Sequence, residues 1–134
     1  MNSLNGHIVK VEVSGHLSIV SVLVAEQIQL KAIVVETPES ASYLQEGQAI
    51  AMLFKETEVV IGTGENLTIS LQNKIPATIV QIEQGKLLSK LTLTTVAGNI
   101  CSLISTNAVQ QLGLKEQLKV NAMIKLNEVM LSVI

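Results

Sequence analysis

The two halves of the sequence repeat each other. Residues 55–61 (KETEVVI) and 125–131 (KLNEVML) share a lysine, a glutamate and an apolar ending, 70 positions apart. Residues 6–12 (GHIVKVE) match residues 77–83 (ATIVQIE) at a separation of 71. Matches that keep their order in this way indicate an internal duplication, so the chain is expected to fold as two similar units.

The segment between the repeats sets their boundaries. Residues 62–66 (GTGEN) place two glycines among polar residues, which is typical of a loop. We therefore predict a first repeat at 1–63 and a second at 68–134. Each is close to the size at which one core is only marginally stable, so the repeats are expected to pack against each other or against other copies of the chain.

Apolar and polar residues alternate within each repeat, which is the spacing of β-strands. Val20, Val22 and Val24 follow this pattern in the first repeat, as do Leu91 and Leu93 in the second. The pattern predicts strands at 7–13, 20–24, 28–35, 49–54 and 58–61, and again at 77–83, 91–93, 100–105, 118–125 and 128–132.

One short helix is predicted in each repeat, at 39–44 and at 107–112. Both segments are polar and contain leucine; Pro38 suits the start of the first, and Gly113 suits the end of the second. Three strands, a short helix and two further strands suit a small closed barrel. We therefore predict an all-β protein, a tandem pair of small five-stranded OB-like barrels, each with one short helix.

The charged residues exclude several kinds of site. All nine cations are lysines and all eleven anions are glutamates, which gives a net charge of −2. Without Arg or Asp, the chain has neither an aspartate-oriented catalytic triad nor a bidentate arginine clamp. Tyr43 and Phe54 are the only aromatic residues, too few to stack along single-stranded nucleic acid. We therefore expect no enzymatic activity and no nucleic-acid partner.

The remaining composition bears on location. Cys101 is the single cysteine, so no internal disulfide can form. Apolar stretches such as 49–54 are far too short to cross a bilayer, and residues 1–7 lack the features of a signal peptide. We expect a cytoplasmic protein with no membrane partner.

Several motifs, in order, resemble those of a known family. They are SLQN at 70–73, ISTNA at 104–108, LGLKEQ at 112–117 and KLNEVML at 125–131, with LQEG at 44–47 and KETEV at 55–59 in the first repeat. Together they resemble the Mop domain, also called the TOBE domain, of molbindins. The resemblance implies intracellular binding of molybdate, or tungstate, for storage and homeostasis. It also implies a homo-oligomer, a trimer for a chain with two repeats.

The same resemblance implies which residues hold the oxyanion. By motif position they are Ser70, Gln72, Asn73, Ser105, Lys125 and Lys55. Molybdate at neutral pH is an unprotonated dianion that can only accept hydrogen bonds. Hydroxyl, amide and ammonium donors therefore suit it, and no side chain is expected to ligate the metal directly.

Some positions depart from the family pattern. Gln72 stands where the family has an arginine, and Ala108 stands where it has a serine. In the first repeat, Val35 and Pro38 occupy the positions of Ser105 and Ala108. These changes leave a second interpretation open, a molybdate-sensing or oligomerisation module that acts with a DNA-binding regulator or a transporter ATPase.

Overall fold

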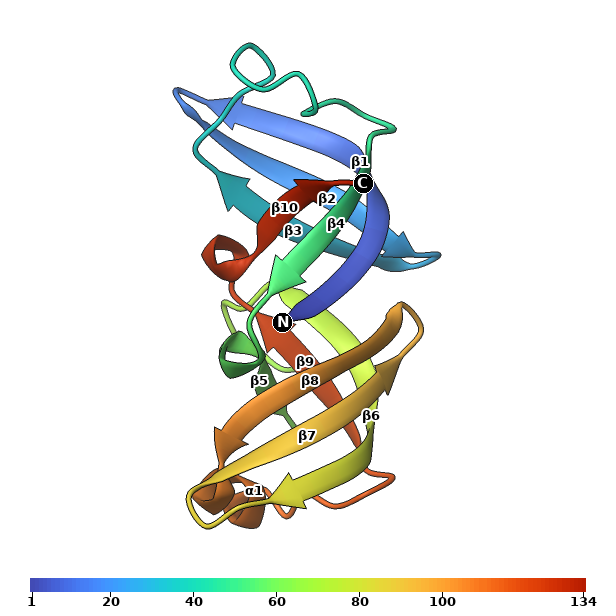
Figure 1. Ribbon diagram of the computed structural model, residues 1–134, viewed down its shortest axis with the longest axis vertical. Helices are drawn as coiled ribbons and strands as arrows, with labels where there is room; N and C mark the ends of the chain where they lie inside the picture. Colours follow the sequence, from blue (N-terminus) through green and yellow to red (C-terminus); the bar gives the residue numbers. More distant parts are fainter.

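The computed structural model describes residues 1–134 as two antiparallel five-stranded sheets placed end to end (Figure 1). In the first sheet the order is β10-β4-β1-β2-β3, formed by Met130–Val133, Ala49–Phe54, Asn2–Ser14, Leu17–Ala25 and Ile28–Val34. In the second the order is β5-β9-β6-β7-β8, formed by Val60–Gly62, Lys119–Ile124, Asn73–Gln84, Leu88–Thr95 and Gly98–Ser105.

Each sheet curls until its two edge strands meet. The edges β10 and β3 contact each other in the first sheet, and β5 and β8 do so in the second. No backbone ladder joins either pair of edge strands, so each barrel is closed by packing between its edges. The predicted all-β class and the tandem of two five-stranded OB-like barrels are confirmed.

The last strand of each repeat lies in the sheet of the other repeat. The strand β5 pairs with β9, so that Ile61 lies opposite Ala122, and β10 pairs with β4, so that Leu131 lies opposite Met52. Two 3₁₀ turns, η1 (Glu56–Glu58) and η2 (Leu126–Glu128), lead the chain across; η1 packs on β8 and η2 packs on β3. The sequence repeats 1–63 and 68–134 therefore do not coincide with the two sheets.

The strand registers are the same in both sheets. A bulge interrupts β1 between Ile8 and Lys10, and the equivalent bulge interrupts β6 between Ile79 and Gln81. These positions are 71 apart, which is the separation of the matching sequence blocks.

The second repeat forms its predicted helix, and the first does not. The helix α1 (Thr106–Gln111) begins at Ser105, whose Oγ accepts a hydrogen bond from the backbone N–H of Ala108 at 3.0 Å. Residues 39–44 form separate turns instead, so the prediction of a helix there was wrong. Val35 has no side-chain oxygen that could accept a capping hydrogen bond, and Pro38 has no backbone N–H that could donate one.

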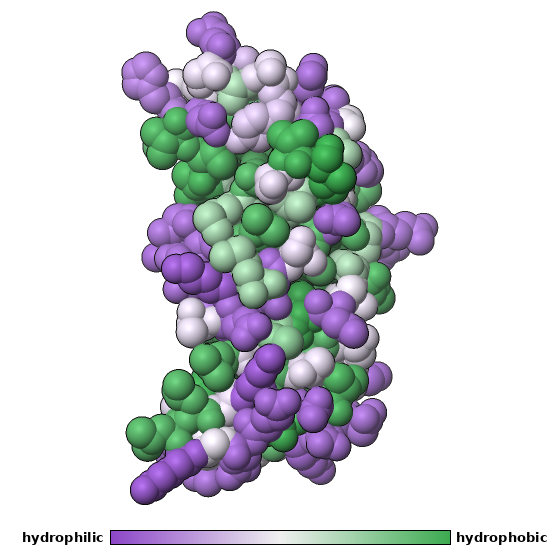
Figure 2. Space-filling model, viewed as in Figure 1, coloured by the Kyte–Doolittle hydropathy of each residue, from purple (hydrophilic) through white to green (hydrophobic).

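One hydrophobic core runs through both sheets. The alternating apolar residues point inward, and the largest fully buried side chains come from both units: Phe54, Leu4, Ile8, Leu30, Leu44, Ile50, Met52, Ile75, Ile79, Leu91, Leu93 and Ile100. Figure 2 shows that apolar side chains also reach the surface over both sheets. No helix of the chain is long and apolar enough to cross a lipid bilayer.

Candidate functional site

Four of the predicted ligand residues lie at the start of β6 and the end of β9: Ser70, Gln72, Asn73 and Lys125. Asn73 pairs with Ile124 in the β6–β9 ladder, so Gln72 and Lys125 are the next residues outward on the two strands. Ser70 lies two residues before Gln72, in the segment that enters β6. Ser70, Gln72 and Lys125 are all exposed, and Lys125 forms no ion pair within the chain. This end of the sheet therefore presents a hydroxyl, an amide and an unpaired ammonium group to solvent.

Asn73 has a different environment, because its side chain is buried. Its Oδ1 accepts a hydrogen bond from the backbone N–H of Lys31 at 2.7 Å, and its Nδ2 donates to the carbonyl of Lys31 at 2.8 Å. Lys31 belongs to β3 of the other sheet. The amide of Asn73 therefore joins the two sheets.

Asn2 forms the equivalent contact from the first repeat. Its Nδ2 donates to the carbonyl of Cys101 at 2.8 Å, and its Oδ1 accepts from the backbone N–H of Cys101 at 2.8 Å. Sequence reasoning missed both contacts. The signal was the occurrence of asparagine at the same position of both repeats.

Ser105 lies at the opposite end of the second sheet. It faces Leu88 in the β7–β8 ladder, and β7 in turn pairs with the far end of β6, where Gln84 faces Ser89. The twelve residues of β6 separate this end from Asn73, a path on the order of 30 Å along the strand. One chain therefore does not bring Ser105 together with Gln72 and Lys125.

Lys55 occupies the position equivalent to Lys125 in the first repeat, just before η1. It lines a surface hollow of about 290 Å³ together with Met1, Glu56, Thr57 and Leu103. Lys55 is exposed and forms no ion pair, but the neighbouring carboxylate of Glu56 reduces the attraction of this hollow for an anion.

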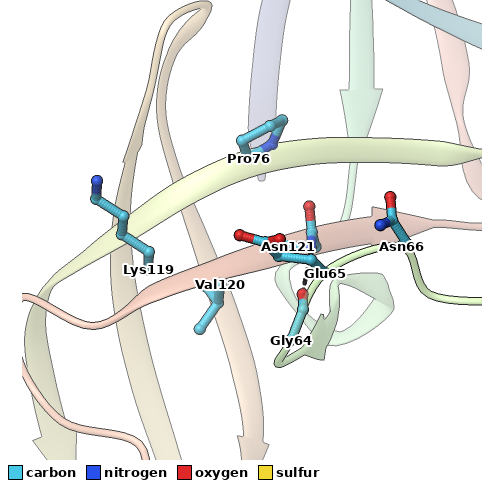
Figure 3. A pocket seen from close by; sticks show the side chains of 7 residues that line it. All are labelled: Gly64, Glu65, Asn66, Pro76, Lys119, Val120 and Asn121. Carbon is cyan, nitrogen blue, oxygen red and sulfur yellow. Dashed lines mark hydrogen bonds between the residues drawn. The ribbon is translucent and has the colours of Figure 1, made fainter.

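A larger hollow lies under the segment between the repeats (Figure 3). Its volume is about 460 Å³, and its lining consists of Gly64, Glu65, Asn66, Pro76, Lys119, Val120 and Asn121. The Nδ2 of Asn121 donates to the carbonyl of Gly64 at 3.3 Å, which holds the segment against β9. None of the residues predicted to bind the oxyanion lines this hollow, and a carboxylate stands in its wall.

The side chains that usually ligate metal ions are dispersed. No three of the histidine, cysteine and glutamate side chains come together as a direct metal site would require. The exposed groups at both ends of the second sheet are hydrogen-bond donors instead, and groups of this kind hold an anion.

Comparison with known proteins points to one kind of anion. The TOBE domain matches residues 69–131. Molybdenum-pterin-binding protein 1 of Clostridium pasteurianum is 33% identical over 66 residues, which cover 48% of this chain and 97% of the relative. Molybdenum-pterin-binding protein 2 of the same organism is 32% identical over 66 residues, with the same coverage.

A solved structure matches the whole chain. It is the cytoplasmic molybdate-binding protein ModG, with molybdate bound. The TM-score is 0.91 at 27% sequence identity, and the match covers 99% of this chain and 96% of the ModG chain.

Proposed function

The chain belongs to the family of the molybdenum-pterin-binding (Mop) proteins, and from this premise we propose that it binds molybdate, or tungstate, for intracellular storage and homeostasis. The observation that carries the proposal is the similarity of both repeats, over nearly their whole length, to ModG with molybdate bound. Because that protein is cytoplasmic, we place this chain in the cytoplasm as well.

The chemistry of the exposed groups supports this ligand. A molybdate dianion accepts hydrogen bonds and donates none, so a selective site needs donors only. The ammonium of Lys125, the hydroxyl of Ser70 and the amide of Gln72 provide donors at one end of the second sheet.

The ligand set is divided between two ends of the sheet. We propose that a second copy of the chain completes it, so that Ser105 of one chain meets Lys125 and Gln72 of another. Such a contact joins different surfaces of the two copies and closes into a ring, and a trimer is the ring that we expect. In this arrangement Asn73 holds β3 next to the site. Lys55 provides a second positively charged group, at the equivalent end of the first sheet, with a weaker attraction for the anion.

Binding without catalysis is the role that fits these residues. The relatives and ModG are named for what they bind. The site offers hydroxyl, amide and ammonium groups, which can hold an anion by hydrogen bonds and charge.

Equilibrium dialysis of the purified chain against molybdate, tungstate and sulfate tests the function. We expect micromolar or tighter retention of molybdate, little retention of sulfate, and at least tenfold weaker molybdate binding for Lys125→Ala. The matched control is Lys119→Ala, an equally exposed lysine outside the site. Equal retention of sulfate, or equal losses in the two variants, would overturn the proposal.

A second candidate function is sensing or oligomerisation in support of a regulator or a transporter ATPase. Gln72 favours it, because this side chain carries no charge where the family has an arginine. Copurification of a DNA-binding or ATP-hydrolysing partner, together with no retained oxyanion, would favour this role over storage.

A further inference from the structure

The segment that joins the two repeats, residues 63–72, carries two of the predicted ligand residues, Ser70 and Gln72. We call this segment the strap. None of its backbone groups forms a hydrogen bond with another backbone group, because the strap lies outside both sheets. Side-chain contacts hold it in place instead, and they are made by Lys74, Leu67 and Asn121.

The contact of Lys74 closes a loop around the two ligand residues. The half-buried Nζ of Lys74 donates a hydrogen bond to the carbonyl of Leu67 at 2.9 Å, and Lys74 forms no ion pair. Because Leu67 precedes Ser70 and Lys74 follows Gln72, this bond joins the chain on both sides of them. Asn73, inside the same loop, is fixed to the first sheet by its buried amide. Ser70 and Gln72 are therefore held between two anchored points.

The side chain of Leu67 provides the second contact. A methyl group at Gly62 would come within 2.6 Å of Cδ1 of Leu67 and 2.7 Å of Cε of Met123, so the ends of these two side chains fill the space beside Gly62. The equivalent residue of the second repeat is Ser132, which pairs with β4 as Gly62 pairs with β9. Strand pairing therefore tolerates a side chain at this position, and the glycine makes room for Leu67.

The third contact is the weakest. The Nδ2 of Asn121 in β9 donates to the carbonyl of Gly64 at 3.3 Å, which is long for a hydrogen bond (Figure 3). A segment with no backbone ladder and few buried contacts opens at a small cost in free energy. The strap can therefore leave β9 while the two sheets stay folded.

We propose that closure of the strap is coupled to oxyanion binding, and that Lys74 and Leu67 are positioning residues that hold Ser70 and Gln72 in the binding arrangement. The inference rests on the proposed function. An anion that contacts Ser70 and Gln72 binds the closed strap better than the open one, so it shifts the strap towards closure. By the same coupling, contacts that favour closure tighten the binding of the anion.

Limited proteolysis measures the closure directly. A glutamate-specific protease cuts after Glu65, an exposed residue of the strap. We expect saturating molybdate to slow this cut by about fivefold, and sulfate to leave it unchanged. Cleavage after Glu46, an exposed residue of the loop before β4, is the internal control and should not respond.

The outcomes separate the inference from the proposed function. Retention of molybdate in equilibrium dialysis without slower cleavage after Glu65 would overturn the inference and leave molybdate binding standing. No retention of molybdate would overturn the proposed function and the inference with it.

Variants of Lys74 test the anchor. Lys74→Met keeps the length of the side chain but removes the donor, and we expect about tenfold weaker molybdate binding together with loss of the protection at Glu65. Lys74→Arg keeps a donor and should restore both. Full binding by a folded Lys74→Met chain would contradict the inference.

A variant of Leu67 separates the position of the strap from the charge of Lys74. Leu67→Ala changes neither a charge nor a hydrogen-bond donor, and we expect it to weaken binding and to abolish the protection at Glu65 as Lys74→Met does. Thr68→Ala, at the exposed next residue of the strap, is the matched control and should change neither. If Lys74→Met weakens binding and Leu67→Ala does not, Lys74 acts through its charge alone and the inference is wrong.

Discussion

The side-chain amide of Asn73 in β6 forms two hydrogen bonds with the backbone of Lys31 in β3, a strand of the other sheet. Asn2 makes the same pair of bonds with Cys101 in the opposite direction. Four hydrogen bonds of one design therefore join the two sheets, and the two asparagines that make them are both buried.

Replacement of Asn73 by alanine should destabilise the whole chain. The change leaves the half-buried backbone N–H and carbonyl of Lys31 without their partners, at a cost of about 2–4 kcal/mol in the free energy of unfolding. Urea denaturation followed by circular dichroism measures this change. Asn107→Ala, an exposed position in α1, is the control and should shift stability by less than about 0.5 kcal/mol.

Removal of residues 130–134 should weaken the first sheet rather than the second. These residues contain β10, which pairs with β4. Without β10 the backbone of β4 becomes an exposed edge, so its amide hydrogens should exchange faster while those of β7 stay protected. Hydrogen exchange with mass spectrometry checks this, and removal of the exposed Ile134 alone should change neither strand. Faster hydrogen exchange confined to the second sheet would contradict the placement of β10 in the first sheet.

Gln117→Gly should stabilise the chain. Gln117 has a φ of 72°, and its equivalent in the first repeat is Gly47, with a φ of 88°. A side chain in this left-handed region costs about 1–2 kcal/mol, and the greater freedom of glycine in the unfolded chain offsets part of the gain. We expect a net gain of about 0.5–1 kcal/mol by urea denaturation, and a loss of similar size for the reverse change, Gly47→Gln.

Gln72→Arg should tighten molybdate binding. A guanidinium at this exposed position adds a charge-assisted hydrogen bond, which contributes about 1.5–3 kcal/mol and so about a ten- to hundredfold gain in affinity. Isothermal titration calorimetry measures the affinity. Gln45→Arg adds the same charge at an exposed position of the first repeat, and an equal gain there would show that net charge alone is responsible.

Stability at alkaline pH should depend on Tyr43. Burial, together with a hydrogen bond of 2.7 Å to the carboxylate of Glu36, raises the pKa of Tyr43 to about 12 from 10.0. Since the folded chain holds this proton more tightly than the unfolded chain, the contribution is complete below pH 10 and is lost as the pH rises towards 12. The midpoint temperature of thermal unfolding should therefore fall more steeply between pH 10 and pH 12 for the native chain than for Tyr43→Phe. The variant is the control, because its lysines titrate over the same range.

Much of the architecture could be predicted from the sequence, because strand alternation and duplication are local or repeated signals. The exchange of β5 and β10 could not. Val59 and Ile61 point their side chains inward, and their spacing would be the same in either sheet. The alternation of apolar residues therefore does not predict which strand they pair with. The absence of a helix in the first repeat could have been predicted from the sequence. Val35 has no side-chain oxygen to accept the capping hydrogen bond, and Pro38 has no backbone N–H to donate it.

The candidate site was harder to predict than the fold. Motif positions predict Ser105 and Lys125 as ligand residues, but distance along the chain does not reveal that β6 separates them by the length of the sheet. The SLQN motif predicts Asn73 as a ligand residue. Its contact with Lys31 could not be predicted in the same way, because it depends on a strand that is far away in the sequence.

The crossing of β5 and β10 between the sheets has a consequence for how the fold responds to dilution. A molecule with a single repeat would have to borrow its fifth strand from a separate molecule, and would lose it as the concentration falls. Here donor and acceptor sheets share one covalent chain, so the effective concentration of each strand is fixed by the short turns at η1 and η2. The two barrels should therefore stay complete at concentrations where an exchanged pair of half-length chains would come apart.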